Sequence, residues 1–171
     1  MGLRDLLGRL ATGVGADTGP EVDEDRARRL AAAATDDSVT TDALLAVDDR
    51  TQYPLVAYVE DDEQPEFLFR GGVLMVSDGD STAREAPTRE LAVVVSDRRF
   101  LFVVGGHLSD SLFEVPFEDV AMAYVDDEDA RRYLVVETDR EDAVTFFADV
   151  TSDPRPDALR AAIEYAETAA N

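Results

Sequence analysis

Two adjacent arginines, Arg98 and Arg99, are the residues of this sequence best suited to binding chemistry. They lie between two apolar runs in VVVSDRRFLFVVGG, residues 93–106. An arginine pair can bind an anion or an acidic partner through charge-assisted hydrogen bonds. The same pattern is typical of a β-hairpin bend in which Asp97 accepts backbone N–H groups and an arginine pairs with a carboxylate on a neighbouring strand. We favour the hairpin role and keep the binding role as the alternative.

The rest of the sequence offers few groups for catalysis or metal binding. It contains no cysteine and one histidine, His107, so it lacks a thiolate nucleophile and the ligands of a Cys or His metal cluster. Acidic clusters occur at 60–63, 126–129 and 139–142, but such turn carboxylates are usually solvated. The stretch DGDSTARE lacks the central glycine of a calcium-binding EF-hand loop. We therefore predict no enzyme activity, no catalytic residue, no cofactor and no metal.

The charge of the chain is strongly negative. Its 38 acidic residues face 16 basic ones, all of them arginine, and the formal net charge is −22. This composition indicates a salt-adapted cytoplasmic protein of a halophilic archaeon, because about 1 M salt shortens the Debye length to about 3 Å and screens the repulsion. No basic stripe suits nucleic acid, and no apolar stretch approaches the roughly 20 residues that span a bilayer.

A leucine face is predicted near the start of the chain. Leu3, Leu6, Leu7 and Leu10 follow the i, i+3, i+4, i+7 spacing of one side of a helix. These leucines could pack on the rest of the chain or on a second copy, or they could contact a partner or a membrane surface. We favour packing over membrane contact, because so short a helix binds bilayers weakly by itself.

The patterning divides the chain into a helical extension, residues 1–50, and a strand-rich domain, residues 51–171. Helical segments are expected after Pro20 and in TTDALLAV, which has a threonine or aspartate cap. Residues 77–88 are polar and predict a loop. Short strands separated by polar turns are predicted at 66–71, 73–77, 90–96, 100–105, 111–117, 120–125, 131–138 and 143–150.

A C-terminal helix closes the predicted domain. Ser152 or Asp153 is the expected cap, and prolines lie in the opening turn. In the strand of residues 99–104, Phe100, Phe102 and Val104 are expected to share one face. The helix carries an apolar stripe that should lie on the sheet, formed by Leu159, Ala162, Ile163, Ala166 and Ala170.

Three segments resemble the prokaryotic pleckstrin-homology-like (PH-like) domains of the YokE-like group. They are EDDEQPEFLFRG, VVVSDRRFLFV and VPFEDVAMAYV, and the resemblance covers residues 53 to 171. It implies an α+β, mainly β fold: a PH-like barrel of about seven antiparallel strands capped by a C-terminal helix. Phosphoinositide-binding PH domains carry several basic residues around their first loop, whereas this chain has Arg70 alone there, which argues against that ligand.

These observations lead to two hypotheses for function. The first is a non-enzymatic module that binds a protein or self-assembles, using a sheet edge or a groove beside the C-terminal helix. The alternative is a peripheral membrane protein that inserts Leu3, Leu6, Leu7 and Leu10 and contacts lipid headgroups with Arg98 and Arg99.

Overall fold

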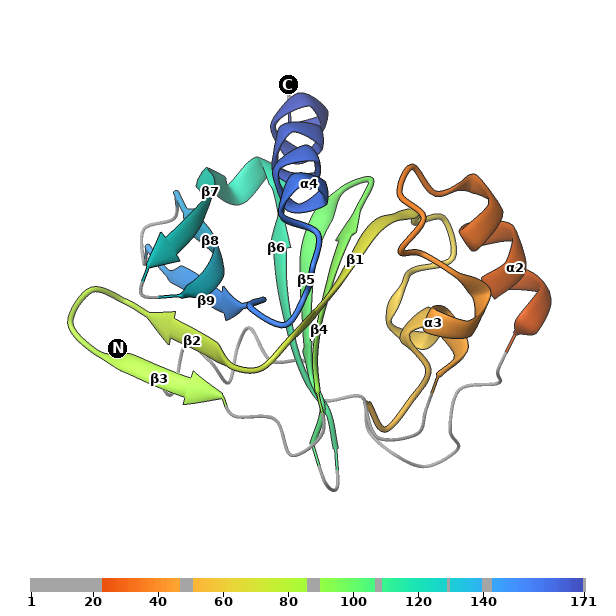
Figure 1. Ribbon diagram of the computed structural model, residues 1–171, viewed down its shortest axis with the longest axis horizontal. Helices are drawn as coiled ribbons and strands as arrows, with labels where there is room; N and C mark the ends of the chain where they lie inside the picture. Colours follow the sequence, from red (N-terminus) through yellow and green to blue (C-terminus); the bar gives the residue numbers. More distant parts are fainter. Residues whose placement is uncertain are drawn as a thin grey trace.

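The chain folds into two antiparallel β-sheets with helices packed around them (Figure 1). The computed structural model describes residues 23–46, 51–85, 90–106, 109–128, 130–139 and 143–170. The helical elements are α2 (Glu24–Ala33), α3 (Thr41–Leu45), the 3-10 turns η1 (Leu55–Tyr58) and η2 (Phe117–Asp119), and α4 (Pro156–Ala169). The strands are β1 (Pro65–Gly71), β2 (Leu74–Ser77), β3 (Thr82–Glu85), β4 (Leu91–Ser96), β5 (Arg99–Val104), β6 (Ser111–Pro116), β7 (Val120–Glu128), β8 (Arg131–Thr138) and β9 (Thr145–Asp149).

The two sheets do not close into the expected barrel. Sheet A has the strand order β1-β4-β5-β6, and sheet B has the order β3-β2-β9-β8-β7. In the part of the chain that the structure describes there are nine strands, where about seven were predicted, and β6 and β7 share no ladder. The expectation of a closed barrel was wrong because η2 turns the chain between these two strands, and β7 then pairs with β8 alone. Helix α4 contacts β7, η2 and β1 at this opening.

The chain crosses from sheet A to sheet B at Gly71 and Gly72. The N–H of Gly72 donates to the carbonyl of Asp149 at 2.9 Å, and the N–H of Asp149 donates to the carbonyl of Val73 at 2.8 Å. A Cβ added to Gly71 would lie 2.4 Å from the carbonyl oxygen of Asp149. The crossing therefore requires a residue without a side chain at position 71.

Replacing Gly71 with alanine is expected to lower the free energy of unfolding by about 1–3 kcal/mol, the usual cost of overpacking. The matched control is Gly72→Ala, whose added Cβ would meet nothing closer than the Asp149 carboxylate at 3.8 Å. Chemical denaturation of the two variants measures the difference. Equal unfolding midpoints would show that the backbone moves apart at the crossing without cost.

Residues 82–85 form β3, although the sequence predicts a loop over 77–88. Strand β3 pairs with β2 from Ser77↔Thr82 onward. The turn between them is closed locally, because Asp78 Oδ1 accepts the N–H groups of Asp80 at 3.1 Å and Ser81 at 2.8 Å. The loop prediction was wrong here because β3 is an outer strand of four residues in which Ala83 alone is apolar, so the sequence shows no run of alternating apolar residues.

Sheet A is buried on both faces. Phe100, Phe102 and Val104 of β5 share the face that packs against sheet B and α4, which confirms the predicted alternation. Leu101 and Val103 point to the opposite face and pack against the helical N-terminal elements. Figure 1 shows α2 and α3 on one side of sheet A and sheet B on the other. The six residues of β4 are accordingly all buried.

Helices α2 and α3, which cover the outer face of sheet A, are fixed by capping side chains and by contacts with η1. The side chain of Asp23 caps α2, and Thr40 caps α3, where the sequence predicts a threonine or aspartate cap. The Arg26 guanidinium donates to the carbonyls of Val56 at 3.0 Å and Val59 at 2.8 Å, which ties α2 to η1 and the residue that follows it. Residues 24–45 therefore lie directly on the outer face of sheet A.

Helix α4 begins later than its predicted cap. Its first residue is Pro156, and the residue before the helix is Arg155, not Ser152 or Asp153. Asp153 Oδ1 accepts the N–H of Arg155 at 3.1 Å, so it braces the turn that leads into the helix. The apolar stripe is confirmed at four positions, Leu159, Ala162, Ile163 and Ala166, whereas Ala170 is exposed.

Candidate functional site

Arg99 is buried and bound by carboxylates. Its Nε donates to Glu63 Oε1 at 2.8 Å and its Nη2 to Glu63 Oε2 at 2.6 Å, while Nη1 pairs with Glu114 on the neighbouring strand β6. The side chain of Arg99 is 7% exposed and that of Glu63 is fully buried. The predicted pairing of a bend arginine with a carboxylate on a neighbouring strand is therefore present.

The pKa of Glu63 lies below its usual value. Burial raises this pKa, but the hydrogen bonds from Arg99, Ser96 and the backbone N–H of Glu60 together lower it by more. A carboxyl whose pKa is lower in the folded state stabilises the fold above its unfolded pKa, and that contribution is lost as the pH falls through the folded value. The pair therefore favours the folded chain at neutral pH.

Arg98 lies at the surface of the same bend. Its side chain is 38% exposed, and its guanidinium donates to Asp62 Oδ1 at 3.2 Å and to the Asp62 carbonyl at 2.7 Å. The bend itself is closed by Ser96, whose Oγ accepts the N–H groups of Arg98 and Arg99. The prediction that Asp97 accepts these groups was wrong, because its carboxylate accepts the N–H of Gln64 at 3.1 Å instead. Partner or headgroup contact by the arginine pair stays a prediction.

The structure does not bring the other groups considered in the sequence into a site. Leu3, Leu6, Leu7 and Leu10 lie outside the described residues, as does His107. Across the described ranges, no cluster of three or more His, Cys, Asp or Glu side chains is arranged to hold a metal ion. The helices placed by the structure include none that is long and apolar enough to cross a membrane.

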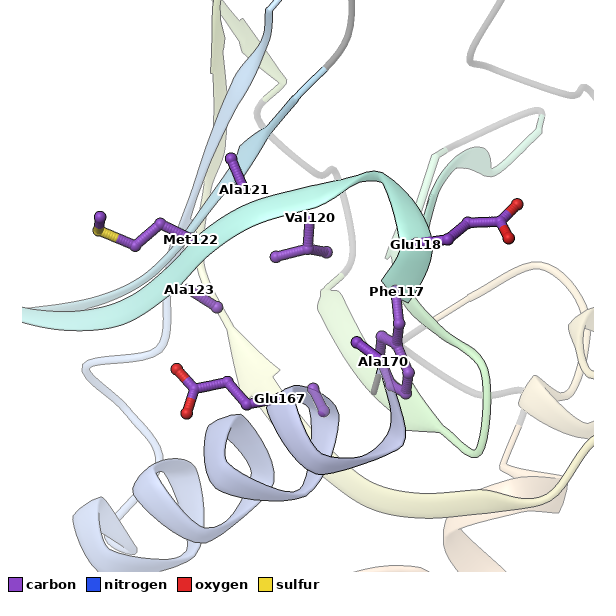
Figure 2. Close-up of a pocket in the computed structure, with 9 residues that line it drawn as sticks. Phe117, Glu118, Val120, Ala121, Met122, Ala123, Glu167 and Ala170 are labelled. Carbon is purple, nitrogen blue, oxygen red and sulfur yellow. The ribbon is translucent and has the colours of Figure 1, made fainter.

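A hollow of about 480 Å³ lies between the start of β7 and the C-terminal part of α4 (Figure 2). In Figure 2, Phe117, Val120 and Ala123 point toward α4, whereas Glu118 and Met122 point away from it. We call this space the apolar hollow, because small and apolar side chains make up most of its lining. It is lined by Phe117, Glu118, Val120, Ala121, Met122, Ala123, Ala166, Glu167 and Ala170.

A second hollow of about 460 Å³ adjoins the first at the end of α4. The two share Phe117, Glu118 and Ala170. We call the second space the acidic hollow, because its four carboxylates outnumber its two guanidinium groups, those of Arg98 and Arg99. It is lined by Glu60, Asp97, Arg98, Arg99, Glu114, Pro116, Phe117, Glu118, Ala169 and Ala170. Together the two hollows form a continuous surface that we call the α4 groove.

Strand β7 forms one wall of the groove and is the outer strand of sheet B. Backbone groups on the outer side of such a strand can pair with an added segment. Two large apolar side chains of β7 are exposed, Met122 at 55% and Tyr124 at 36%. The second half of the strand carries Asp126 and Asp127, charges of the kind that discourage pairing at a sheet edge.

Sequence reasoning singled out Arg98, Arg99, Ala166 and Ala170 of this groove, but not the residues of β7 that form its wall. The register of β7 against β8 shifts between Val120 and Met122, so a bulge at Ala121 interrupts the strict alternation of faces. Val120 and Ala123 consequently point to the same side in Figure 2. The run VAMAYV predicts a strand, but no pattern within it indicates the bulge.

The fold, and not the sequence, shows a similarity to a known protein. The described fold is α+β, with two antiparallel sheets and a C-terminal helix. The chain is similar to the solved Vps36 N-terminal PH domain, with a TM-score of 0.46 and 10% sequence identity over 64% of this chain and 83% of that one. No family model matches the sequence, and no curated protein matches it either.

Proposed function

We propose that this chain is a non-enzymatic PH-like interaction module that binds an apolar, basic peptide segment in the α4 groove. The observation that carries the proposal is the apolar hollow between β7 and α4, which opens beside an outer strand and continues into the acidic hollow. The arrangement of two antiparallel sheets and a C-terminal helix agrees with the PH-like resemblance in the sequence.

The apolar hollow supplies most of the expected affinity. Burying one leucine-sized side chain contributes about 1.5–3 kcal/mol. The hollow is lined by Phe117, Val120, Ala123 and Ala166, whose apolar side chains can contact such a group. This contribution persists at high salt, where charge interactions between exposed groups are screened.

The acidic hollow supplies selectivity for basic side chains. Glu60, with its side chain 58% exposed, and the exposed Glu118 lie on it, and the local excess of carboxylates repels an acidic ligand. Arg98 and Arg99 do not reverse this preference. They pair with Glu60, Asp97 and Glu114 of the hollow and also with Asp62 and Glu63 beside it, so the local charge stays negative. A peptide that joins an apolar anchor to an arginine or lysine suits both hollows.

Replacing Ala170 with tryptophan is expected to weaken peptide binding by about tenfold or more, equivalent to about 1.4 kcal/mol. Ala170 is exposed and lines both hollows, so the new side chain would occupy the space that the peptide needs. The probes are peptides selected from a random display library against the wild-type protein, and fluorescence anisotropy measures their dissociation constants.

The matched control is Ala161→Trp, which places the same side chain on an exposed position of α4 away from the groove. We expect the selected peptides to combine apolar and basic residues and to bind this control like the wild type. Failure to select any peptide, or equal binding to the Ala170→Trp variant, would contradict the proposal.

A further inference from the structure

We propose that the segment occupying the α4 groove is residues 1–10 of this same protein, MGLRDLLGRL. In this arrangement the leucine side chains enter the apolar hollow, and an arginine of the segment meets the carboxylates of the acidic hollow. The inference rests on the proposed peptide-binding function and names its ligand.

The composition of the segment matches the two hollows. Four of its ten residues are leucine, and their spacing predicts that they share one face. It carries Arg4 and Arg9 against one acid, Asp5, so its side chains have a net positive charge within a chain of net charge −22. The groove offers the complementary pair of surfaces, an apolar wall beside an excess of carboxylates.

The side chains that line the apolar hollow leave room for leucine side chains. Ala123, Ala166 and Ala170 present small side chains, so space remains between β7 and α4 beside the ring of Phe117. Figure 2 shows Phe117, Ala123 and Ala170 around one opening at the end of α4. Leucine side chains entering this opening would contact the Phe117 ring and the alanine methyl groups, whereas a polar side chain buried there would lose its hydration.

The length of chain between the segment and the described structure permits this contact. Residues 11–22 separate Leu10 from Asp23, where the described structure begins. Such a stretch spans about 40 Å when extended, which is comparable to the diameter of a folded chain of this size. A linker of this reach is compatible with contact in the same copy or in a second copy, and the size of the cross-linked product distinguishes the two.

Cysteine cross-linking in the full-length protein tests the inference directly. The natural chain has no cysteine, so an introduced pair has no competing thiol. We would combine Ala170→Cys with Leu6→Cys, Leu7→Cys or Leu10→Cys in separate variants and oxidise each with copper phenanthroline. A disulfide requires Cα atoms within about 7 Å, so its formation reports the segment in the groove.

The matched control pairs the same leucine variants with Ala161→Cys, on an exposed face of α4 away from the groove. We expect at least one leucine position to form a disulfide with position 170 and none to form one efficiently with position 161. Adding Arg4→Glu and Arg9→Glu should reduce the yield several-fold. A monomeric product on a non-reducing gel indicates the chain's own groove, and a dimeric product indicates a second copy.

Equal or absent cross-linking at positions 170 and 161 would overturn the inference. If library-selected peptides still bind the groove in that case, the proposed function stands and the ligand is another protein. If those peptides also fail to bind, the groove itself is not a binding site. Flotation of the uncross-linked protein with phosphatidylglycerol vesicles, together with no preference for position 170, would instead assign the leucines to a membrane surface.

Discussion

Replacing Arg99 with methionine is expected to lower the free energy of unfolding by about 3–5 kcal/mol, the cost of breaking a buried ion pair from one side. The change would leave the Glu63 carboxylate, whose side chain is fully buried, without its cation. It would also remove the link from β5 to the carbonyl of Tyr58 and to Glu114 on β6. Urea denaturation followed by circular dichroism measures the loss.

Arg98→Met provides the control in the same bend. Its guanidinium also pairs with carboxylates, but the side chain is 38% exposed, and such surface pairs contribute about 1 kcal/mol or less. The double variant Glu63→Leu with Arg99→Met should be more stable than Arg99→Met alone, because it buries no uncompensated charge. A loss for Arg99→Met no larger than that for Arg98→Met would show that water reaches Glu63 and that the pair is not a buried one.

A chain shortened to residues 51–171 is expected to aggregate instead of folding as a soluble monomer. Removing α2 and α3 would uncover apolar side chains on the outer face of sheet A, and a contiguous exposed apolar patch promotes association. The affected residues belong to β1, β4, β5 and β6: Leu68, Ala92, Val94, Leu101, Val103 and Leu112. Size-exclusion chromatography with light scattering would detect the aggregate.

A chain of residues 23–171 is the control, because it keeps α2 and α3 over this face. We expect it to remain monodisperse under the same conditions. The full-length variant Leu44→Ala should lose about 2–5 kcal/mol of stability, because Leu44 of α3 is buried against the outer face of sheet A. A soluble, cooperatively unfolding chain of residues 51–171 would mean that the helical elements are dispensable for folding.

These predictions concern different parts of one arrangement. Arg99 and Glu63 hold the segment after η1 against the end of the β4–β5 hairpin, and α2 and α3 cover the outer face of sheet A. The apolar hollow of the α4 groove lies between β7 and α4, and the acidic hollow extends to the end of the β4–β5 hairpin, where Arg99 lines it. Variants that remove α2 and α3 should therefore affect stability, and Ala170→Trp should affect binding. Arg99→Met should affect both, because Arg99 also lines the acidic hollow.

The sequence by itself determined the features that depend on local spacing. Alternating apolar residues placed Phe100, Phe102 and Val104 on one face of β5. The helical spacing of Leu159, Ala162, Ile163 and Ala166 identified the buried side of α4, and Thr40 marked the start of α3. Such signals can be read because strand and helix periods and capping hydrogen bonds involve residues a few positions apart.

Only the tertiary structure decided how these elements meet. Glu63 lies 36 residues before Arg99, and nothing in either local stretch indicates that the two side chains form a buried pair. The open edge at β7 depends on η2, which turns the chain between β6 and β7, and the bulge at Ala121 shifts the register of β7 against β8. The groove exists because α4 packs across that opening, and such long-range packing follows from the burial of whole faces and not from a repeating pattern in the sequence.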